Sequence, residues 1–473
     1  MERLSAADVM QLITDVGPAP MQIGACLLLD AGPGFDAAAV RRCLAGRVLA
    51  VPRLRQRLVR TPPGCGRPVW LDDPAFDVGH HVREQRCPAP GDDDALLGLA
   101  ADVVTTPLPL SRPPWGAVLV TGLTGPSAAL ILVLHHVLAD GIGGLAVLAS
   151  LADGDPAGPG GPGDRGAPEV PAKAPDGLPA PDGLPAPDGL PAPAPSRRSL
   201  AADAWAGRLR ALRDLPGAMS TVRRSAAELG VRSPARAARC SLNQPTGPRR
   251  RLAVVTAGLG EVRALAHAHG GTVNDVILAA VAGAVRRLLA SRGETLPALV
   301  VSVPVSARAS ASAGHLGNEA GVMPVALPTG GDLPGRLDRT AAITRARKAP
   351  VPGASAVLLG TAFRLLAALG VFRLFINHQR LVHTFITNVR GPSRRLRLGG
   401  ATISAVVPVT VAAGNVTVSF GVLSYAGTLV VTVVADPGRL PDLGVLTAAL
   451  RQELAECGSA TNLLPAGRSS QAG

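Results

Sequence analysis

Short apolar runs alternate with segments of helical period along this chain. Ala128–Leu134 is a continuous apolar run that ends in a polar cluster, which is the pattern of a buried strand. The segment that follows, Gly141–Leu151, has the apolar spacing of a helix. Ala298–Val305 is a second buried-strand run, and Val416–Ser424 with Thr428–Ala435 predicts a hairpin. Strands and helices are therefore predicted in both halves of the chain.

The strongest helix prediction covers Thr272–Arg292. Thr272 can cap the first turn through its hydroxyl oxygen, and Gly293 can end the helix. A more basic helix is predicted over Ser199–Leu229, with a break at Pro216-Gly217. The apolar positions of the first helix follow the i, i+3, i+4, i+7 rule and are Val273, Val276, Ile277, Ala280, Val281, Ala284, Val285 and Leu288.

The segment Asp153–Pro195 has the composition of a linker. Gly, Pro, Ala and Asp dominate it, and Ala-Pro-Asp-Gly-Leu-Pro occurs three times in tandem, from Ala174, Ala180 and Ala186. Such a segment cannot bury a core, so we expect an extended, disordered connection. The predicted organisation is an N-terminal lobe over 1–152, a linker over 153–196, a C-terminal lobe over 197–460 and a flexible tail over 461–473.

The composition fits two domains with large apolar cores. The chain has 473 residues, of which 47% are hydrophobic and 17% are charged. Aromatic residues make up 2%, which argues against a single-stranded nucleic acid as partner because few side chains could stack on bases. The apolar runs fall well short of the about 20 residues of a membrane span. With no signal peptide visible in Met1–Asp15 and six cysteines without C-x-x-C spacing, we expect a cytoplasmic protein with neither a zinc site nor a redox motif.

Positive charge is concentrated in one stretch. The formal net charge is +13, and Arg197–Arg251 holds thirteen Arg against Asp203, Asp214 and Glu228, which gives 13 − 3 = +10. A solvated helical face, or a generally Arg-rich composition, explains this about as well as attraction to anionic lipid headgroups or to a polyphosphate ligand such as coenzyme A. Nucleic acid is the weaker third interpretation because no reading motif accompanies the charge.

The candidate chemistry lies in His135-His136-Val137-Leu138-Ala139-Asp140-Gly141. It stands where the first apolar run ends and a Gly-rich turn begins, so a histidine there can project into a cleft. A neutral imidazole can accept a proton from an alcohol at neutral pH. A core histidine, a metal site with Asp140 and a purely structural turn remain open alternatives, although adjacent histidines on a strand point in opposite directions and rarely share one ion. Spacing alone slightly favours a structural role.

Other chemistries find little support in the sequence. It has no G-x-S-x-G nucleophile elbow and no G-x-x-x-x-G-K-[ST] phosphate loop. The second histidine pair, His80-His81, is not followed by Asp-Gly and is interpreted as ordinary structure.

The segment His135-His136 to Asp140-Gly141 matches the HHxxxDG motif of the coenzyme-A-dependent acyltransferase superfamily. More closely, the chain resembles the bacterial wax ester synthase/diacylglycerol acyltransferase family over nearly all of its length except the linker and the tail. The order and spacing of several blocks make the resemblance specific. The blocks are Leu4-Ser5-Ala6-Ala7-Asp8, Pro20-Met21-Gln22-Ile23-Gly24, Pro52-Arg53-Leu54-Arg55-Gln56-Arg57-Leu58, Phe76-Asp77, Pro90-Gly91, Arg112-Pro113-Pro114-Trp115, Thr272-Val273-Asn274-Asp275, Val303-Pro304-Val305-Ser306 with Arg308, Leu316-Gly317-Asn318 and Thr387-Asn388-Val389-Arg390-Gly391-Pro392.

This resemblance implies an α/β fold of two chloramphenicol-acetyltransferase-like lobes, with mixed sheets and flanking helices, around a central channel. His136 would deprotonate an acceptor hydroxyl, which then attacks the thioester carbonyl of acyl-CoA. Asp140 would hold the loop, with an ion pair to Arg308 as our hypothesis, and Asn274 would help hold the oxyanion. A capping role for Asn274 and its neighbour Asp275 is the alternative. The implied site residues are His135, His136, Asp140, Gly141 and Asn274 for catalysis, and Trp115, Asp275 and Arg308 for substrate binding.

The expected function is esterification of a lipid hydroxyl, from diacylglycerol to triacylglycerol, from a long-chain alcohol to a wax ester, or both. The expected partners are acyl-CoA as substrate, the lipid acceptor and a peripheral anionic membrane or lipid inclusion, with no metal and no further cofactor. A carrier-protein-dependent, condensation-like acyltransferase and a catalytically silent lipid-binding protein are the alternatives. Gln22, Pro114 and Pro107-Leu108-Pro109-Leu110 depart from the family pattern and bear on acyl-chain fit.

Overall fold

The computed structural model describes residues 2–125, 127–153, 196–213, 236–306, 318, 320–347, 355–458 and 460–461. Arg308, the tandem repeats, the second half of the predicted basic helix and nearly all of the predicted linker and tail lie outside these residues. The hypothesis of an ion pair between Asp140 and Arg308 therefore lies outside them as well.

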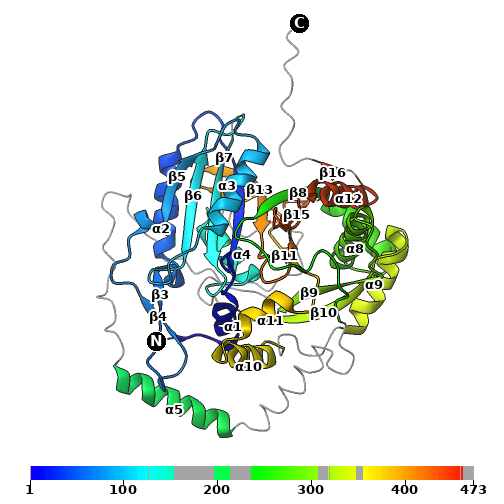
Figure 1. Cartoon of the computed structure of the whole chain (residues 1–473). Coiled ribbons are helices and arrows are strands. Elements are labelled where there is room, and N and C mark those ends of the chain that lie inside the picture. The colour runs from blue at the N-terminus through cyan, green and yellow to red at the C-terminus, as the bar shows by residue number, and fades with distance from the viewer. Residues whose placement is uncertain are drawn as a thin grey trace.

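Two mixed sheets with flanking helices make up most of the described chain (Figure 1). The helices are α1 (Ala6–Thr14), α2 (Ala37–Leu49), α3 (Asp93–Thr105), α4 (Gly141–Leu151), α5 (Arg197–Arg213), α7 (Leu259–Ala268), α8 (Val273–Ser291), α9 (Leu333–Arg347), α10 (Ser355–Ala368), α11 (Phe372–His378) and α12 (Leu443–Ala455), with short 3-10 turns η1 (Pro52–Arg55) and η2 (Val78–His80). The strands are β1 (Glu2–Arg3), β2 (Gln22–Asp30), β3 (Gln56–Val59), β4 (Val69–Asp72), β5 (Val82–Arg86), β6 (Trp115–Thr121), β7 (Ser127–His135), β8 (Arg251–Gly258), β9 (Ala298–Ser306), β10 (Ala320–Pro328), β11 (Thr384–Arg390), β12 (Arg397–Leu398), β13 (Ala401–Val409), β14 (Val418–Tyr425), β15 (Thr428–Ala435) and β16 (Ala460–Thr461).

The first sheet has six strands in the order β12-β13-β2-β7-β6-β5. Its central strand β7 is buried on both faces. Leu130, Leu132 and Leu134 pack with helices α2 and α4, whereas Ile131 and Val133 pack with α3 on the opposite face. Burial on both faces explains why this strand is a continuous apolar run and not an alternating one.

The second sheet has seven strands in the order β10-β9-β11-β14-β15-β8-β16, and a separate three-stranded sheet has the order β1-β4-β3. Helices α7, α8, α9 and α12 contribute to one apolar core with the strands of the seven-stranded sheet. Helix α8 is buried along almost its whole length, which its Ala-rich sequence allows because small side chains let neighbours approach closely. Strand β11 runs parallel to both of its neighbours, β9 and β14.

Strand β13 joins the two halves of the chain. It lies within the predicted C-terminal lobe, but it pairs antiparallel with β2 and completes the first sheet, with Val406 opposite Leu27 and Val409 opposite Gly24. The next strand, β14, returns to the second sheet. The sheets therefore do not divide at the sequence linker, because strand pairing depends on backbone hydrogen bonds between residues far apart in sequence.

Several elements predicted from the sequence pattern are present in the described residues. The run Ala128–Leu134 lies in β7, and the segment Gly141–Leu151 is helix α4. Helix α8 begins after the cap Thr272, whose side chain accepts from the Asp275 N–H. The predicted hairpin is β14–β15, and the run from Ala298 is β9. None of the described helices is both long and apolar enough to span a bilayer.

A buried ion pair ties three helices of the second core together. Arg336 of α9 bonds to Glu453 of α12, and both side chains are almost fully buried. The Arg336 Nε also donates to the backbone oxygen of Ala279 in α8, at 3.2 Å. The pair lies over Gly283 of α8, where a Cβ would collide with both charged groups. Burial raises the pKa of Glu453, while the two arginines near it favour the ionised form.

We expect Glu453→Ala to cost about 3–5 kcal/mol of unfolding free energy, because it leaves the Arg336 guanidinium buried without its partner. Arg451→Ala, at an exposed position of the same helix, should change stability by less than about 0.5 kcal/mol. Urea unfolding of both variants would measure the difference. A loss below about 1 kcal/mol for Glu453→Ala would contradict this role of the pair.

Candidate active site

His136 directly follows the last residue of β7, and four residues separate it from the first residue of α4. Its backbone N–H donates to the backbone oxygen of Met21, the residue before β2, at 2.8 Å. This bond fixes the end of β7 next to the start of β2. The two histidines of the motif have different surroundings. His135 is buried, its Nδ1 accepts from the Val137 N–H at 3.0 Å, and its Nε2 therefore donates to Asp15 at 3.1 Å. His136 is half-buried and lines a cavity instead, so the two rings do not share one ligand.

The imidazole of His136 is held by Asn318. Its Nδ1 lies 3.0 Å from Asn318 Oδ1. The Asn318 Nδ2 donates to Asp8 at 2.9 Å and to the backbone oxygen of His136 at 2.7 Å, which identifies the nitrogen and the oxygen of the amide. An amide oxygen can only accept, so Nδ1 carries the proton and Nε2 is left with a free lone pair. This is the tautomer that a general base requires.

Asp8 anchors this arrangement from the N-terminal helix. It is the third residue of α1, where it forms a capping box with Ser5, and its side chain is buried. Its Oδ1 accepts both the backbone N–H of Asn318, at 2.8 Å, and the Asn318 amide. Asp8, Asn318 and His136 therefore form one hydrogen-bonded series that links α1, a residue two positions before β10 and the end of β7.

Asn318 is the functional residue that sequence reasoning did not assign. It appeared as the last residue of the block Leu316-Gly317-Asn318, but no role was given to it. It lies 182 positions from His136, and neither periodicity nor motif spacing connects the two. Its presence in a family block was the one signal that pointed to it.

Burial lowers the pKa of His136 below its ordinary value, against the opposing effects of the Asn318 hydrogen bond and the Asp140 charge. The ring is therefore neutral at neutral pH. Burial alone would raise the pKa of Asp15, but the hydrogen bonds from His135 and the Met21 N–H outweigh it and lower that pKa. A carboxylate thus faces His135, whereas an uncharged amide faces His136.

Asp140 and Gly141 shape the turn after the histidines. Asp140 is buried and caps α4, where its Oδ1 accepts the Gly143 N–H at 2.8 Å. Gly141 lines the cavity, and a Cβ at this position would lie 3.0 Å from the Val389 Cγ2. The close approach of α4 to β11 therefore leaves little room for a side chain here.

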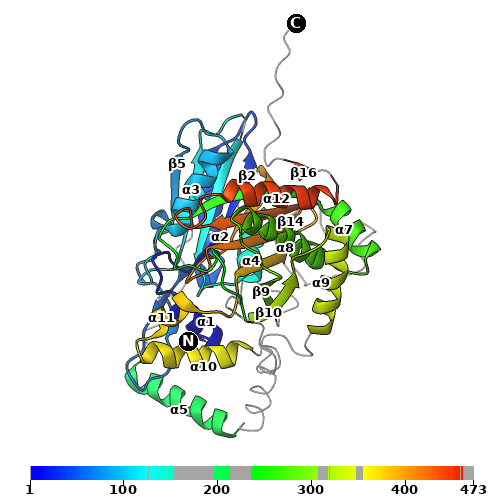
Figure 2. The same ribbon diagram turned by 45° about the vertical axis from the view of Figure 1, so that its right-hand side comes forward.

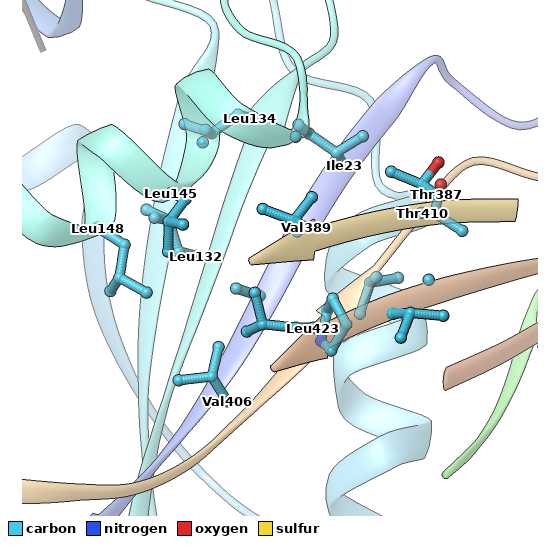
Figure 3. A pocket seen from close by; sticks show the side chains of 18 of the residues that line it. Ile23, Leu132, Leu134, Leu145, Leu148, Thr387, Val389, Val406, Thr410 and Leu423 are labelled. Atoms are coloured by element: carbon cyan, nitrogen blue, oxygen red, sulfur yellow. The ribbon is translucent and has the colours of Figure 1, made fainter. Parts of the chain in front are cut away.

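The cavity beside His136 lies between the two sheets and is apolar. Its empty volume is about 740 Å³, including the part open to solvent. Figure 3 shows Leu145 and Leu148 of α4 with Leu132 and Leu134 of β7 near the aliphatic side chains of β11, β13 and β14. Three of the described lining residues carry polar side chains, namely His136, Thr387 and Thr410. Such a lining suits a hydrocarbon chain whose reactive end meets the imidazole.

Asn274 and Asp275 lie behind the strand that lines the cavity. The Asn274 Oδ1 accepts a hydrogen bond from Asn388 of β11 at 3.3 Å. Asn388 directly follows Thr387, which lines the cavity, and successive side chains of a strand point to opposite faces. Asp275 is buried and accepts from the backbone and hydroxyl of Thr272, both at 2.8 Å, and from the Thr344 hydroxyl at 2.7 Å. The geometry gives Asp275 a capping and packing role, and contact of either residue with substrate stays a prediction.

Trp115 and Gln22 are buried away from the described cavity lining. The Trp115 Nε1 donates to the Leu54 oxygen at 2.7 Å, and its ring stacks on His81 with centroids 4.6 Å apart. Gln22 donates to the backbone oxygens of Val104 and Thr106 and so fixes β2 to the end of α3. These contacts give both side chains a structural role in packing. The contact with substrate that was expected of Trp115 stays a prediction. No group of three or more potential metal ligands occurs among the residues that the structure describes.

A neutral, oriented histidine at an apolar cavity between two lobes defines an acyltransferase of the HHxxxDG type. Residues 4–277 match the wax ester synthase/diacylglycerol acyltransferase catalytic domain, and residues 316–457 match the WS/DGAT C-terminal domain. The protein belongs to the wax ester synthase/diacylglycerol acyltransferase family. As the resemblance implied, the fold is that of two chloramphenicol-acetyltransferase-like lobes.

The comparisons with individual proteins agree with this assignment. The chain is 31% identical over 443 residues to the probable diacylglycerol O-acyltransferase tgs1 of Mycobacterium tuberculosis strain H37Rv, which covers 92% of this chain and 90% of the relative. The wax ester synthase/diacylglycerol acyltransferase from Marinobacter aquaeolei VT8 superposes with a TM-score of 0.64 at 24% identity, covering 96% of this chain and 98% of that one. The first condensation domain of the calcium-dependent antibiotic synthetase has the same fold, with a TM-score of 0.60 at 19% identity, covering 96% and 95%.

The site geometry predicts how His136 titrates. Its pKa should lie below the ordinary imidazole value of about 6.5. The bond to Asn318 favours the protonated ring, so Asn318→Ala should lower that pKa further. Nitrogen-15 NMR of histidine-labelled protein, with His136→Ala for assignment, would measure both the tautomer and the midpoint. An unchanged midpoint and tautomer in Asn318→Ala would contradict the role of Asn318.

Proposed function

We propose that the protein is an acyl-CoA-dependent O-acyltransferase that esterifies a lipid hydroxyl, converting diacylglycerol to triacylglycerol, a long-chain alcohol to a wax ester, or both. The observation that carries this proposal is the free Nε2 of His136 at the wall of an apolar cavity, with Nδ1 held by Asn318. A hydrocarbon cavity favours a fatty acyl or alkyl chain, and a neutral imidazole favours removal of a hydroxyl proton.

The proposed reaction requires a base, an acceptor hydroxyl and a thioester. His136 Nε2 takes the proton of the acceptor hydroxyl as its oxygen attacks the thioester carbonyl. The new C–O bond forms, the tetrahedral intermediate collapses, and the C–S bond breaks. The imidazolium then returns the proton to the departing coenzyme A thiolate, so that ester and free thiol are the products. Acyl-CoA is consumed as a substrate, and no bound cofactor is part of this scheme.

Asn318 and Asp140 stabilise the imidazolium that forms during this reaction. The Asn318 oxygen accepts from Nδ1 in both protonation states, and the nearby Asp140 charge favours the protonated ring. Asn274 remains our candidate for positioning or for the oxyanion, acting from the first turn of α8.

The partners that we propose are acyl-CoA, the lipid acceptor and the lipid phase in which that acceptor dissolves. Both the acyl chain and the acceptor are insoluble in water, so the enzyme would work in peripheral contact with an anionic membrane or with lipid inclusions inside the cell. The strongly basic composition supports such contact.

We expect purified protein to release coenzyme A from palmitoyl-CoA when diacylglycerol or a long-chain alcohol is present. His136→Ala should lower kcat by about 10²–10⁴-fold because it removes the base. Asn274→Ala should have the smaller effect. Free-thiol detection measures the release, and thin-layer chromatography identifies the ester. Equal rates for His136→Ala and wild type would overturn the mechanism. If ester formed only from a carrier-bound acyl group and not from acyl-CoA, the donor would be that of a condensation-like enzyme.

A further inference from the structure

The largest group of exposed aliphatic side chains in the described chain lies on helices α10 and α11 and in the residues directly after each of them. Ten large apolar residues of the described chain are well exposed, and five of them fall between residues 365 and 381. They are Leu365, Leu369, Val371, Leu374 and Leu381, and three of them, Leu365, Leu369 and Leu374, have 62–65% of their surface exposed. We call this group the α10–α11 face. An exposed apolar cluster of this kind usually marks an interaction surface.

The helices that carry the α10–α11 face are held in place by packing on their inner side. Phe363, Phe372 and Phe375 pack together on the inner side of the two helices, with centroids 5.0–6.2 Å apart. The side of α10 that carries Gly360 lies against α1, where an added Cβ would be 3.5 Å from the Ala6 oxygen. The outward leucines are therefore not needed for the local core.

The charge along the segment that carries the face is of one sign. Between Asp338 and Asp436 the sequence contains eleven Lys or Arg and no Asp or Glu. Arg364, Arg373 and Arg380 are exposed and alternate in sequence with the aliphatic residues of the face. Aliphatic side chains among arginines, without a carboxylate, complement an apolar layer that is covered by anionic headgroups.

Helix α5 adds a second element of the same chemistry at this end of the molecule. Both views place α5 and α10 at the same end, with α1 above α10 (Figures 1 and 2). Trp205 and Leu209 of α5 lie one helical turn apart, and both are more than half exposed. Arg208 lies 5.1 Å from the Trp205 ring. Tryptophan beside arginine is typical of the interface between water and lipid.

The α10–α11 face lies close to the candidate active site. Helix α10 packs on α1, and α1 carries the Asp8 that holds Asn318 and, through it, His136. The thickness of one helix therefore separates the α10–α11 face from the hydrogen bonds that orient the base. A lipid phase in contact with the face would lie close to the site that uses its molecules.

We propose that the α10–α11 face, together with Trp205 and Leu209, docks the protein peripherally on a lipid surface that carries anionic headgroups. The leucines insert among the acyl chains, and the arginines bind the headgroup phosphates. This inference rests on the proposed lipid acyltransferase function, because it identifies the surface through which the acceptor is reached.

Vesicle co-sedimentation tests the proposal without turnover. Wild type should bind vesicles of phosphatidylcholine with about a third phosphatidylglycerol more tightly than phosphatidylcholine alone, and salt should weaken this binding. The triple variant Leu365→Ser, Leu369→Ser, Leu374→Ser should raise the Kd at least about tenfold, since three inserted aliphatic chains are lost. Leu49→Ser with Val445→Ser removes exposed aliphatic residues from elsewhere on the surface and should bind as wild type does.

The outcomes separate this proposal from the catalytic one. His136→Ala should bind vesicles as wild type does, because the base takes no part in docking. Wild type that docks but releases no coenzyme A would contradict the acyltransferase proposal alone. The triple variant should keep its rate with a short, water-soluble alcohol as acceptor, which also reports that it is folded. Equal vesicle binding by wild type and triple variant would overturn the docking proposal. So would a wild-type dimer that the triple variant converts to monomer without any vesicle binding, because the face would then be an interface between two copies.

Discussion

The arrangement of the site depends on the hydrogen bonds that converge on Asn318. The side-chain amide of Asn318, two positions before β10, joins Asp8 of α1 to the backbone and ring of His136. Its orientation leaves its oxygen as the only atom that can face the imidazole. Because the partners come from three distant parts of the chain, the tautomer of His136 is set only when these parts have come together. A buried carboxylate at the far end of the series keeps the amide from turning over.

The apolar cavity follows from how the two sheets are connected. Strand β13 is paired in the first sheet and β14 in the second, and residues of both line the cavity beside β7, α4 and β11. Gly141 allows α4 to approach β11 closely without closing that space. The strand exchange thus provides both the attachment between the lobes and the wall along which a hydrocarbon chain can lie.

Charge is distributed in a way that suits a lipid substrate. Burial keeps His136 neutral, while the Asn318 hydrogen bond and the Asp140 charge favour the protonated ring. Outside the site, the arginines of α5, α10 and α11 accompany exposed aliphatic side chains. Charge is therefore limited at the His136 ring, whereas these arginines lie together with exposed aliphatic side chains on the surface where we propose that a lipid phase binds.

The sequence by itself determined the elements whose signals lie between neighbouring residues. The sequence predicted strand β7 from its continuous apolar run, and helix α8 from its period and its Thr272 cap. It also contained the motif from His135-His136 to Asp140-Gly141, and the order of the motifs led to the correct family. Only the tertiary structure decided that Asn318 orients His136, that β13 completes the first sheet, and that Trp115 and Asp275 are held by packing. Periodicity records which side of its own element a residue faces. It does not record which distant residue will meet it, because that contact is fixed only when long loops close and buried polar groups must find partners.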